Sequence, residues 1–205
     1  MVNLLVVIVS CRKNQQLWPK LLDRHIPNSI ILCGDSDVSY LDGKILHLKC
    51  SDAYEGLSEK MMCAFEFLTK CQLFDEYTHI LKADDHDTDF TAEQITEIQR
   101  KHKDILTSKD YIGQNLISER MLGRRHHFGR VAKDSIWYNR EYSEKYKPYL
   151  GGGQTYILSR KALECLVAQK AETVKYILED AMMGALLYNC NIHPLALHYG
   201  IRCWG

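Results

Sequence analysis

The amino-acid sequence predicts an α/β fold, a single domain with a central, mostly parallel mixed sheet flanked by helices. Apolar runs typical of buried strands alternate with helix-spaced segments through the first half of the chain. The 205 residues are enough for one such domain, and no linker, internal repeat or low-complexity segment divides them. Because parallel sheets bind ligands at the carboxyl ends of their strands, the site is expected there.

Four strands and three helices are expected in the first half. The strands are short continuous apolar runs, and the helices repeat apolar residues every three or four positions. Residues 1–9 are predicted to be a strand, because they lack the basic segment and the cleavage site of a signal peptide. The strands are expected at 4–10, 29–33, 45–48 and 80–81, and the helices at 17–22, 56–70 and 91–103.

The second half has a less regular pattern. Residues 104–150 mix tyrosine, histidine and basic residues without a clear period, which indicates short strands and a loop. A strand is then expected at 154–158, followed by a helix that Ser159 caps. A further helix begins at Leu178, and a last strand is expected at 192–197.

A basic cluster lies within the irregular part of the second half. Such a cluster suits a phosphate or an acidic acceptor, and a solvated surface loop is the alternative. Its members are Arg120, Arg124, Arg125, His126, His127 and Arg130.

Composition and charge narrow the classes of function. Lysine plus arginine and aspartate plus glutamate number 26 each, so the formal net charge is zero and bulk binding to nucleic acid or an anionic membrane is not expected. No apolar run approaches the ~20 residues of a membrane-spanning helix. The protein is therefore expected to be cytoplasmic, without an anchor. The eight cysteines form no C-x-x-C pair, and reduced, mostly buried thiols are the expectation.

An acidic segment follows the predicted strand at 80–81. Its four carboxylates fall within six positions, at Asp84, Asp85, Asp87 and Asp89. Neighbouring carboxylates raise each other's pKa, and a bound cation relieves their repulsion. Mg²⁺ and Mn²⁺ prefer oxygen ligands and often join carboxylates to substrate phosphates. The segment predicts a metal site, and the alternative is an acidic loop in which Thr88 and Asp89 cap the next helix.

Four motifs occur in a fixed order over most of residues 52–198. They are DAYEGLSEK at 52–60, ILKADDHD at 80–87, YKPYLGGGQTYILS at 146–159, and LED at 178–180 followed by Gly184. Together they resemble the inverting GT-A glycosyltransferases of the β-1,3-galactosyltransferase and Fringe type. The matching family patterns are D-x-Y-x-x-L-x-x-K, a strand ending in a DxD motif, P-x-Y-x-x-G-G-G-x-x-L-S, and E-D-V-x-x-G. The third motif departs from its pattern by two extra polar residues, Gln154 and Thr155.

The resemblance implies a single GT-A domain over residues 1–205. Residues 1–103 would bind the nucleotide, and residues 104–205 would bind the acceptor and carry the catalytic base. The implied activity is metal-dependent, inverting transfer of a hexose or deoxyhexose from a UDP-sugar to a glycan or glycoprotein hydroxyl. In its size and missing anchor the chain is similar to glycosyltransferase domains of large DNA viruses of the chlorella-virus type, which implies viral capsid glycan synthesis. Further domains are expected only if the chain is a piece of a longer one.

Several residues are expected to contact the nucleotide sugar. Ser10, Cys11 and Arg12 end the first strand, and Arg12 or Lys60 would add positive charge to the diphosphate. Asp35 would read the base or form a turn. The glycine run would let the backbone approach the sugar, with Tyr149 or Trp137 as a stacking face. The complete predicted set is Ser10, Cys11, Arg12, Asp35, Lys60, Asp84, Asp85, Gly152 and Gly153.

The expected cofactor is Mn²⁺ or Mg²⁺. Asp85 and Asp87 would hold it, because these ions prefer oxygen, and Asp84 with His86 is the alternative pair. By resemblance to other GT-A enzymes, His198 would be a third ligand. A surface histidine is the alternative role for this residue, and His193 is the other histidine considered as a ligand.

An inverting reaction needs one general base for the acceptor hydroxyl. By resemblance this is Asp180, with Glu179 as a helper or second choice. The alternative is that both acids only interact favourably with a helix N-terminus. Three other functions remain open, namely a retaining transferase, a nucleotidyltransferase on the same fold, or a non-catalytic nucleotide-sugar-binding module.

Overall fold

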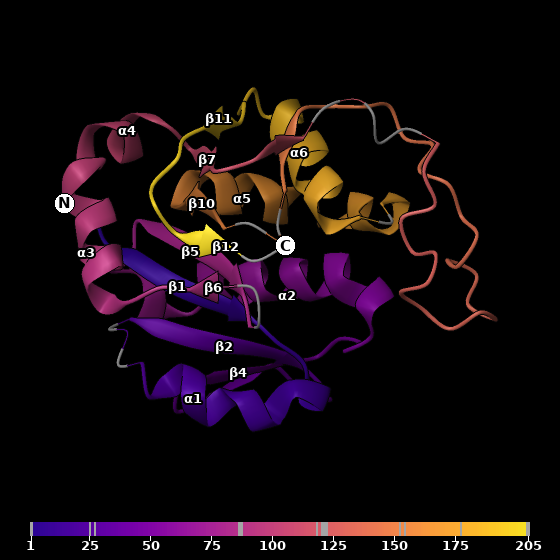
Figure 1. The fold of residues 1–205 in the computed structure, drawn as a ribbon, viewed down its shortest axis with the longest axis horizontal. Coiled ribbons are helices and arrows are strands. Elements are labelled where there is room, and N and C mark those ends of the chain that lie inside the picture. Colours follow the sequence, from indigo (N-terminus) through magenta and orange to yellow (C-terminus); the bar gives the residue numbers. More distant parts are fainter. Residues whose placement is uncertain are drawn as a thin grey trace.

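A large mixed sheet runs through the middle of the protein (Figure 1). The structure, a computed structural model, describes residues 2–24, 26, 28–85, 88–117, 119, 123–151, 153, 155–176 and 178–203. Within these ranges the sheet has eight strands. In sheet order they are β11 (Leu195–Ala196), β7 (Tyr111–Gly113), β10 (Tyr156–Ser159), β5 (His79–Asp84), β1 (Leu4–Val9), β2 (Ser29–Gly34), β4 (Ile45–Leu48) and β3 (Tyr40–Asp42).

The direction of the strands confirms the predicted mostly parallel mixed sheet. β5, β1, β2 and β4 are parallel neighbours, and β11 is parallel to β7. β10 runs antiparallel to both β5 and β7, and β3 runs antiparallel to β4. Two small ladders complete the pairing described. They join β6 (Thr88–Asp89) to β12 (Arg202–Cys203) and β8 (Leu116–Ile117) to β9 (Tyr149–Leu150).

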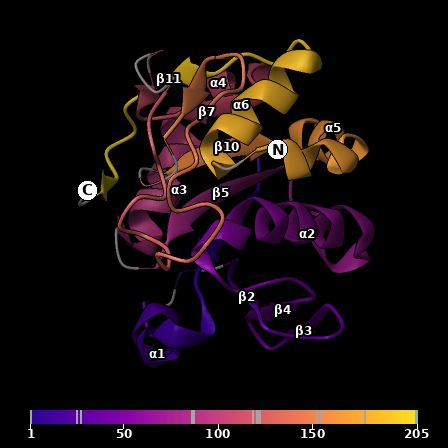
Figure 2. The same ribbon diagram turned by 90° about the vertical axis from the view of Figure 1, so that its right-hand side faces the viewer.

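Helices cover both faces of the sheet (Figures 1 and 2). The α-helices are α1 (Trp18–Leu22), α2 (Leu57–Lys70), α3 (Ala92–Lys101), α4 (Lys103–Ser108), α5 (Arg160–Ala168) and α6 (Glu179–Asn189). Short 3₁₀ helices are η1 (Arg12–Leu17), η2 (Tyr54–Gly56), η3 (Gln72–Phe74) and η5 (Lys170–Lys175). No helix in the described ranges has both the length and the apolar character that crossing a membrane would need.

The two faces of the sheet form two hydrophobic cores, and strand β1 contributes to both. Leu5, Val7 and Val9 pack with α2, α5 and α6. Leu4 and Ile8, with Val6 between them, pack with α1, α3 and α4. Because successive side chains of a strand point to opposite faces, a strand covered on both sides must be apolar at every position. This explains the continuous apolar run that begins the chain.

The structure confirms one expected helix cap and rules out the capping role considered as an alternative for the acidic segment. Ser159 caps α5 as expected, since its hydroxyl accepts a hydrogen bond from the backbone N–H of Ala162. Thr91, and not Thr88 or Asp89 of that alternative, caps α3 in a reciprocal arrangement with Gln94. Residues 88–89 instead form β6, which pairs with β12.

Gly184 brings α6 against β9. A Cβ atom added there would overlap the Cβ of Tyr149 and lie 2.7 Å from the backbone oxygen of Pro148. Any larger residue would therefore push α6 away from this strand. The close approach fixes the start of α6, where Glu179 and Asp180 are located.

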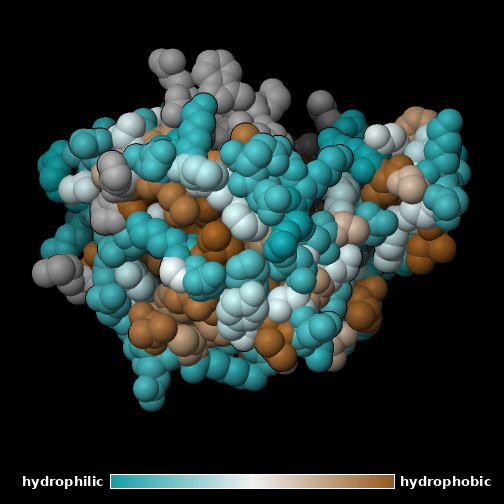
Figure 3. All heavy atoms as spheres, turned by 90° about the horizontal axis from the view of Figure 1, so that it is seen from below, coloured by the Kyte–Doolittle hydropathy of each residue, from teal (hydrophilic) through white to brown (hydrophobic). Residues whose placement is uncertain are grey.

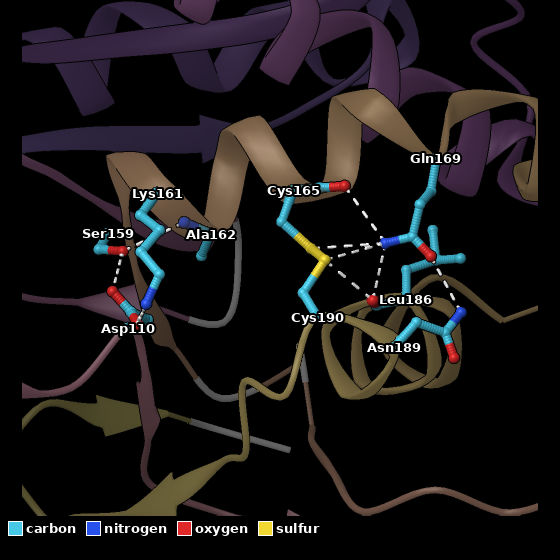
Figure 4. The surroundings of a disulfide bond; sticks show 9 residues. All are labelled: Asp110, Ser159, Lys161, Ala162, Cys165, Gln169, Leu186, Asn189 and Cys190. Carbon is cyan, nitrogen blue, oxygen red and sulfur yellow. Dashed lines mark hydrogen bonds and ion pairs between the residues drawn. A yellow bond between two sulfur atoms is a disulfide. The ribbon is translucent and has the colours of Figure 1, made fainter.

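A disulfide joins α5 to the end of α6 (Figure 4). The Cα atoms of Cys165 and Cys190 lie 6.5 Å apart. The Gln169 side chain beside them donates to the backbone oxygen of Leu186 at 2.8 Å. The expectation of reduced thiols is wrong for these two cysteines, because helix packing joins residues that are 25 positions apart in the chain.

Residues 123–148 form a long segment of turns and bends. It extends from the sheet toward the N-terminal end of α2 and lies at the right in Figure 1. The Ser135 hydroxyl lies 3.5 Å from Glu55, just before α2. The short strands expected in the second half are present as β7, β8 and β9, on either side of this segment.

Candidate active site

The carboxyl ends of β1 and β5 open into a cleft of about 720 Å³. Because these strands are parallel, their ends lie at one edge of the sheet. The cleft is lined by residues 9–14, 52–55, 57, 60, 84, 85 and 130–132. Six predicted donor residues therefore line one hollow, namely Ser10, Cys11, Arg12, Lys60, Asp84 and Asp85.

Asp85 is held in place by two polar side chains from the end of β1. Its Oδ2 accepts hydrogen bonds from Ser10 Oγ at 2.6 Å and from Asn14 Nδ2 at 2.9 Å. The indole N–H of Trp18 donates to the same serine hydroxyl at 2.8 Å. Asp85 is only 5% exposed, so these bonds fix the orientation of its carboxylate in the wall of the cleft.

The first motif organises another part of the cleft wall through an ion pair between the half-buried Asp52 and the buried Lys60. Asp52 also accepts the backbone N–H groups of Gly34 at 2.9 Å and Arg12 at 2.5 Å. The Lys60 ammonium donates to the backbone oxygen of Ser10 at 3.0 Å. This lysine was expected to contact a diphosphate, and the structure shows that its charge is already compensated by Asp52. The pair joins the ends of β1 and β2 to α2.

Arg12 projects from the end of β1 and keeps much of its guanidinium in solvent, with 63% of the side chain exposed. Its Nη1 contacts Asp35 Oδ2 at 2.7 Å, and His47 Nδ1 lies 3.1 Å from the other oxygen. Burial acts to raise the pKa of Asp35, but hydrogen bonds from His47 and Arg12 outweigh it and lower that pKa. Asp35 therefore stays ionised and positions Arg12. It does not itself line the cleft.

The irregular segment contributes a second arginine to the cleft. Arg130 Nη1 donates to the Tyr54 hydroxyl at 2.6 Å, and its guanidinium carbon lies 5.8 Å from the ring centroid of that tyrosine. Among the described members of the basic cluster, Arg130 is the one that lines the cleft. Sequence reasoning identified the cluster but gave no way to choose this residue.

A buried lysine connects the acidic strand end to the predicted catalytic acids. Lys82 is 1% exposed, and its ammonium lies 2.7 Å from Asp84 Oδ1 and 5.6 Å from the ring centroid of Tyr156. Burial acts to lower the pKa of Lys82, but Asp84, Glu179 and Asp180 outweigh it and raise that pKa. The lysine therefore stays charged. Sequence reasoning missed it, because a single lysine in a strand gives no signal of burial.

The two predicted catalytic acids have different environments. Glu179 is 4% exposed and accepts a hydrogen bond from the Tyr156 hydroxyl. Burial, and then repulsion from Asp180, raise the pKa of Glu179 well above its ordinary value. Asp180 is only half-buried. Of the two, Asp180 is the carboxylate that a substrate hydroxyl can reach.

The side chains at the end of β5 are of the type that binds a hard divalent cation, because Asp84 and Asp85 bring carboxylate oxygens to the cleft. Asp87 and His86 lie outside the described residues. Within the described ranges, no group of three or more histidine, cysteine, aspartate or glutamate side chains converges to hold a metal ion.

The remaining predicted site residues that the structure describes are not brought into the cleft. His198 lines a separate groove beside α3, and its Nδ1 lies 3.0 Å from Gln114 Oε1. His193 contacts Asn191 at 3.1 Å. Gly153 is exposed and does not line the cleft, and Gly152 lies outside the described residues.

Comparison with known proteins gives one family match. Residues 35–198 match the profile of the family described as Galactosyltransferase. No curated protein matches the chain.

Similar solved structures include 4-diphosphocytidyl-2C-methyl-D-erythritol synthase from Anaerococcus prevotii, which is 12% identical with a TM-score of 0.45 and covers 98% of this chain and 92% of its own. CMP:2-keto-3-deoxy-manno-octonic acid synthetase in complex with CTP is 11% identical with a TM-score of 0.45, covering 94% of this chain and 89% of its own. The 2-C-methyl-D-erythritol 4-phosphate cytidylyltransferase from Thermus thermophilus is 9% identical with a TM-score of 0.45, covering 97% and 92% respectively.

Proposed function

Because this chain belongs to the galactosyltransferase family, it is a glycosyltransferase that takes its sugar from a nucleotide sugar, and we propose a more specific reaction for it. The proposed reaction is metal-dependent, inverting transfer of a hexose or deoxyhexose from a UDP-sugar to a glycan or glycoprotein hydroxyl. The main support is the cleft at the ends of β1 and β5, which Asp84 and Asp85 line together with Arg12 and Arg130. The proposed biological setting, viral capsid glycan synthesis in host cytoplasm, is supported only by the sequence resemblance.

In the proposed donor complex, Arg12 and Arg130 bind the diphosphate from the two walls of the cleft. A guanidinium donates two parallel hydrogen bonds to phosphate oxygens and keeps its charge at every relevant pH. The wall that carries Arg12 belongs to the proposed nucleotide half, residues 1–103. The wall that carries Arg130 belongs to the proposed acceptor half, residues 104–205. The ion pair of Asp52 and Lys60 supports the wall that carries Arg12, because both side chains bond to the backbone of residues 10–12.

Asp85, with Asp84 beside it and Asp87 as proposed partner, would hold Mn²⁺ or Mg²⁺. When bound, this ion offsets the negative charge that develops on the departing diphosphate. The protein contributes the orientation of the ligands, since Ser10 and Asn14 fix the Asp85 carboxylate before the cation arrives.

Asp180 is the proposed general base. The acceptor oxygen attacks the anomeric carbon as the bond from that carbon to the diphosphate oxygen breaks, and the acceptor proton passes to Asp180. Burial raises the pKa of Glu179, and its carboxyl accepts a hydrogen bond from the Tyr156 hydroxyl, so it supports the base rather than replacing it. The positive charge of Lys82, which pairs with Asp84 at 2.7 Å, also interacts favourably with the charges of Glu179 and Asp180.

The configuration of the product tests the proposal. We expect α-linked UDP-sugars supplied with Mn²⁺ to give a β-linked product. The anomeric signal in the proton NMR spectrum measures the configuration of the new bond. Chelation with EDTA should stop the reaction, and added Mn²⁺ should restore it. An α-linked product would instead establish a retaining transferase. Release of pyrophosphate from UTP and a sugar phosphate would establish a nucleotidyltransferase. Donor binding with no turnover of any kind would establish a binding module.

A further inference from the structure

Side chains, rather than backbone hydrogen bonds, hold the irregular segment 123–148 against the donor cleft. In the described chain, the backbone hydrogen bonds of residues 123–142 all join residues of the segment itself, such as the bond from the Gly123 N–H to the Tyr142 oxygen. Seen from below, the end of the molecule where the segment lies mixes hydrophilic and hydrophobic side chains (Figure 3, right). The position of Arg130, which lines the cleft, thus depends on the side-chain contacts of its segment.

Tyr54 and Glu55, just before α2, contact the segment through their side chains. The Tyr54 hydroxyl accepts a hydrogen bond from Arg130 Nη1 at 2.6 Å, and the guanidinium carbon lies 5.8 Å from the centroid of the tyrosine ring. The His127 ring meets the same tyrosine edge-on, with centroids 5.4 Å apart. The Ser135 hydroxyl lies 3.5 Å from the Glu55 carboxylate. Tyr54 therefore contacts both the arginine that lines the cleft and a histidine three residues before it.

His127 makes the contact with Tyr54 part of a buried aromatic cluster. It is 1% exposed, whereas the next residue, Phe128, is 56% exposed. Its ring also packs against Trp137, with centroids 6.1 Å apart. Burial lowers the pKa of His127, so the ring is uncharged at pH 7 and packs as an aromatic group. Through Tyr54, this cluster joins residues 127–137 to the start of α2.

Tyr54 is itself held by the first motif. It begins η2, two residues after Asp52, whose carboxylate pairs with Lys60. Its side chain is 42% exposed and lines the cleft together with Arg130. An exposed arginine has many rotamers, and ordering it when a ligand binds costs free energy. A tyrosine that orders the arginine beforehand lowers this cost.

We propose that Tyr54 is a positioning residue of the donor site, which holds segment 123–148 against the cleft and orients the Arg130 guanidinium toward the diphosphate. The inference rests on the proposed function, which places Arg130 on the diphosphate, and it adds the residue that sets the position of this arginine. The paired contacts of Tyr54 with Arg130 and His127 carry it. Because Tyr54 acts through Arg130, the effects of replacing the two residues on donor binding are not additive.

A double-mutant cycle tests this inference. The dissociation constant of UDP in the presence of Mn²⁺ is measured by isothermal titration calorimetry for the full chain, Tyr54→Phe, Arg130→Met and the double variant. Phenylalanine keeps the ring against His127 and removes only the hydroxyl that accepts from Arg130. We expect Tyr54→Phe to weaken binding about threefold to tenfold, and Arg130→Met about tenfold or more. The double variant should bind UDP within about twofold of Arg130→Met.

Hydrogen–deuterium exchange measures the contact without any ligand. We expect the backbone amides of residues 127–137 to exchange faster in Tyr54→Ala, which removes the ring, than in the unmodified protein. Tyr54→Phe keeps the ring, so its exchange should stay close to that of the unmodified protein. Its unfolding temperature should also be unchanged, and its weaker UDP binding then reflects the lost bond to Arg130.

Tyr188→Phe on α6 is the matched control. Tyr188 is 39% exposed, with Lys147 Nζ 3.8 Å from its ring centroid and the His193 ring edge-on at 5.0 Å, but it does not line the cleft. This variant should bind UDP as the unmodified protein does.

The inference is overturned if Tyr54→Phe binds UDP as tightly as Tyr188→Phe, or if the losses in Tyr54→Phe and Arg130→Met multiply in the double variant. Multiplied losses would mean that Tyr54 contacts the nucleotide directly. Unchanged exchange in Tyr54→Ala would also overturn it. Failure of the unmodified protein to bind UDP, or unchanged binding in Arg130→Met, would instead count against the proposed function. In that case the exchange measurement alone decides whether Tyr54 holds the segment.

Discussion

Replacing Asp180 with asparagine is expected to lower kcat by about 10²–10⁴-fold, the usual contribution of a general base. The amide has nearly the same shape as the carboxylate but cannot take the acceptor proton. Asp180 does not line the donor cleft, so the dissociation constant for UDP with Mn²⁺ should change less than about twofold. Initial rates and equilibrium titration on the same preparation measure both quantities.

Glu179→Gln is the matched control for this change. Burial, and then repulsion from Asp180, raise the pKa of Glu179; glutamine keeps the shape of its protonated form, and the amide oxygen can still accept a hydrogen bond from the Tyr156 hydroxyl. We expect a much smaller loss of kcat than in Asp180→Asn. Equal loss of donor binding and transfer in Asp180→Asn, or a larger loss of transfer in Glu179→Gln, would refute this division of roles.

Lys82→Met is expected to lower the free energy of unfolding by about 3–5 kcal/mol at pH 7, because it removes the buried cation that pairs with Asp84. The charge of Lys82 lowers the pKa of Glu179, so removing the lysine raises that pKa further in the folded protein. An acid whose pKa is raised by folding costs stability only above its unfolded value, which is about 4.3 for glutamate. The destabilisation should therefore grow from pH 5 to pH 8. Urea unfolding at both pH values measures it.

Lys161→Met provides the comparison for a solvent-exposed lysine. Lys161 also pairs with an aspartate, Asp110 at 2.8 Å, but 72% of its side chain is exposed. An exposed pair of this kind contributes about 0–1 kcal/mol. If Lys82→Met is no more destabilising than Lys161→Met, or if its effect does not depend on pH, the buried charge network does not have the role described.

Periodicity predicted most of the fold. The continuous apolar run of β1 and the helical spacing of α2 each report burial directly, so strand order along the chain and helix positions followed from them. The antiparallel insertion of β10 between β5 and β7 did not follow, since no local pattern records which strands become neighbours. The disulfide between Cys165 and Cys190 could not be predicted for the same reason, because no local pattern records which helices pack together.

For the site, the rule that ligands bind at strand ends placed Ser10, Arg12 and Asp85 at one cleft. The rule does not report how charges are compensated. It could not show that Lys60 is already paired with Asp52, or that Glu179 is buried while Asp180 is accessible. These distinctions depend on distances between segments far apart in the chain.

A crystal of the protein grown with UDP and MnCl₂ allows the position of the cation to be measured from the anomalous scattering of manganese. We expect one strong peak at the carboxyl end of β5, between the Asp85 carboxylate and the diphosphate. Arg12 and Arg130 should contact the diphosphate oxygens that face away from the cation. A peak elsewhere, such as beside His198, or UDP bound in the cleft with no manganese signal next to it, would contradict the metal-dependent mechanism.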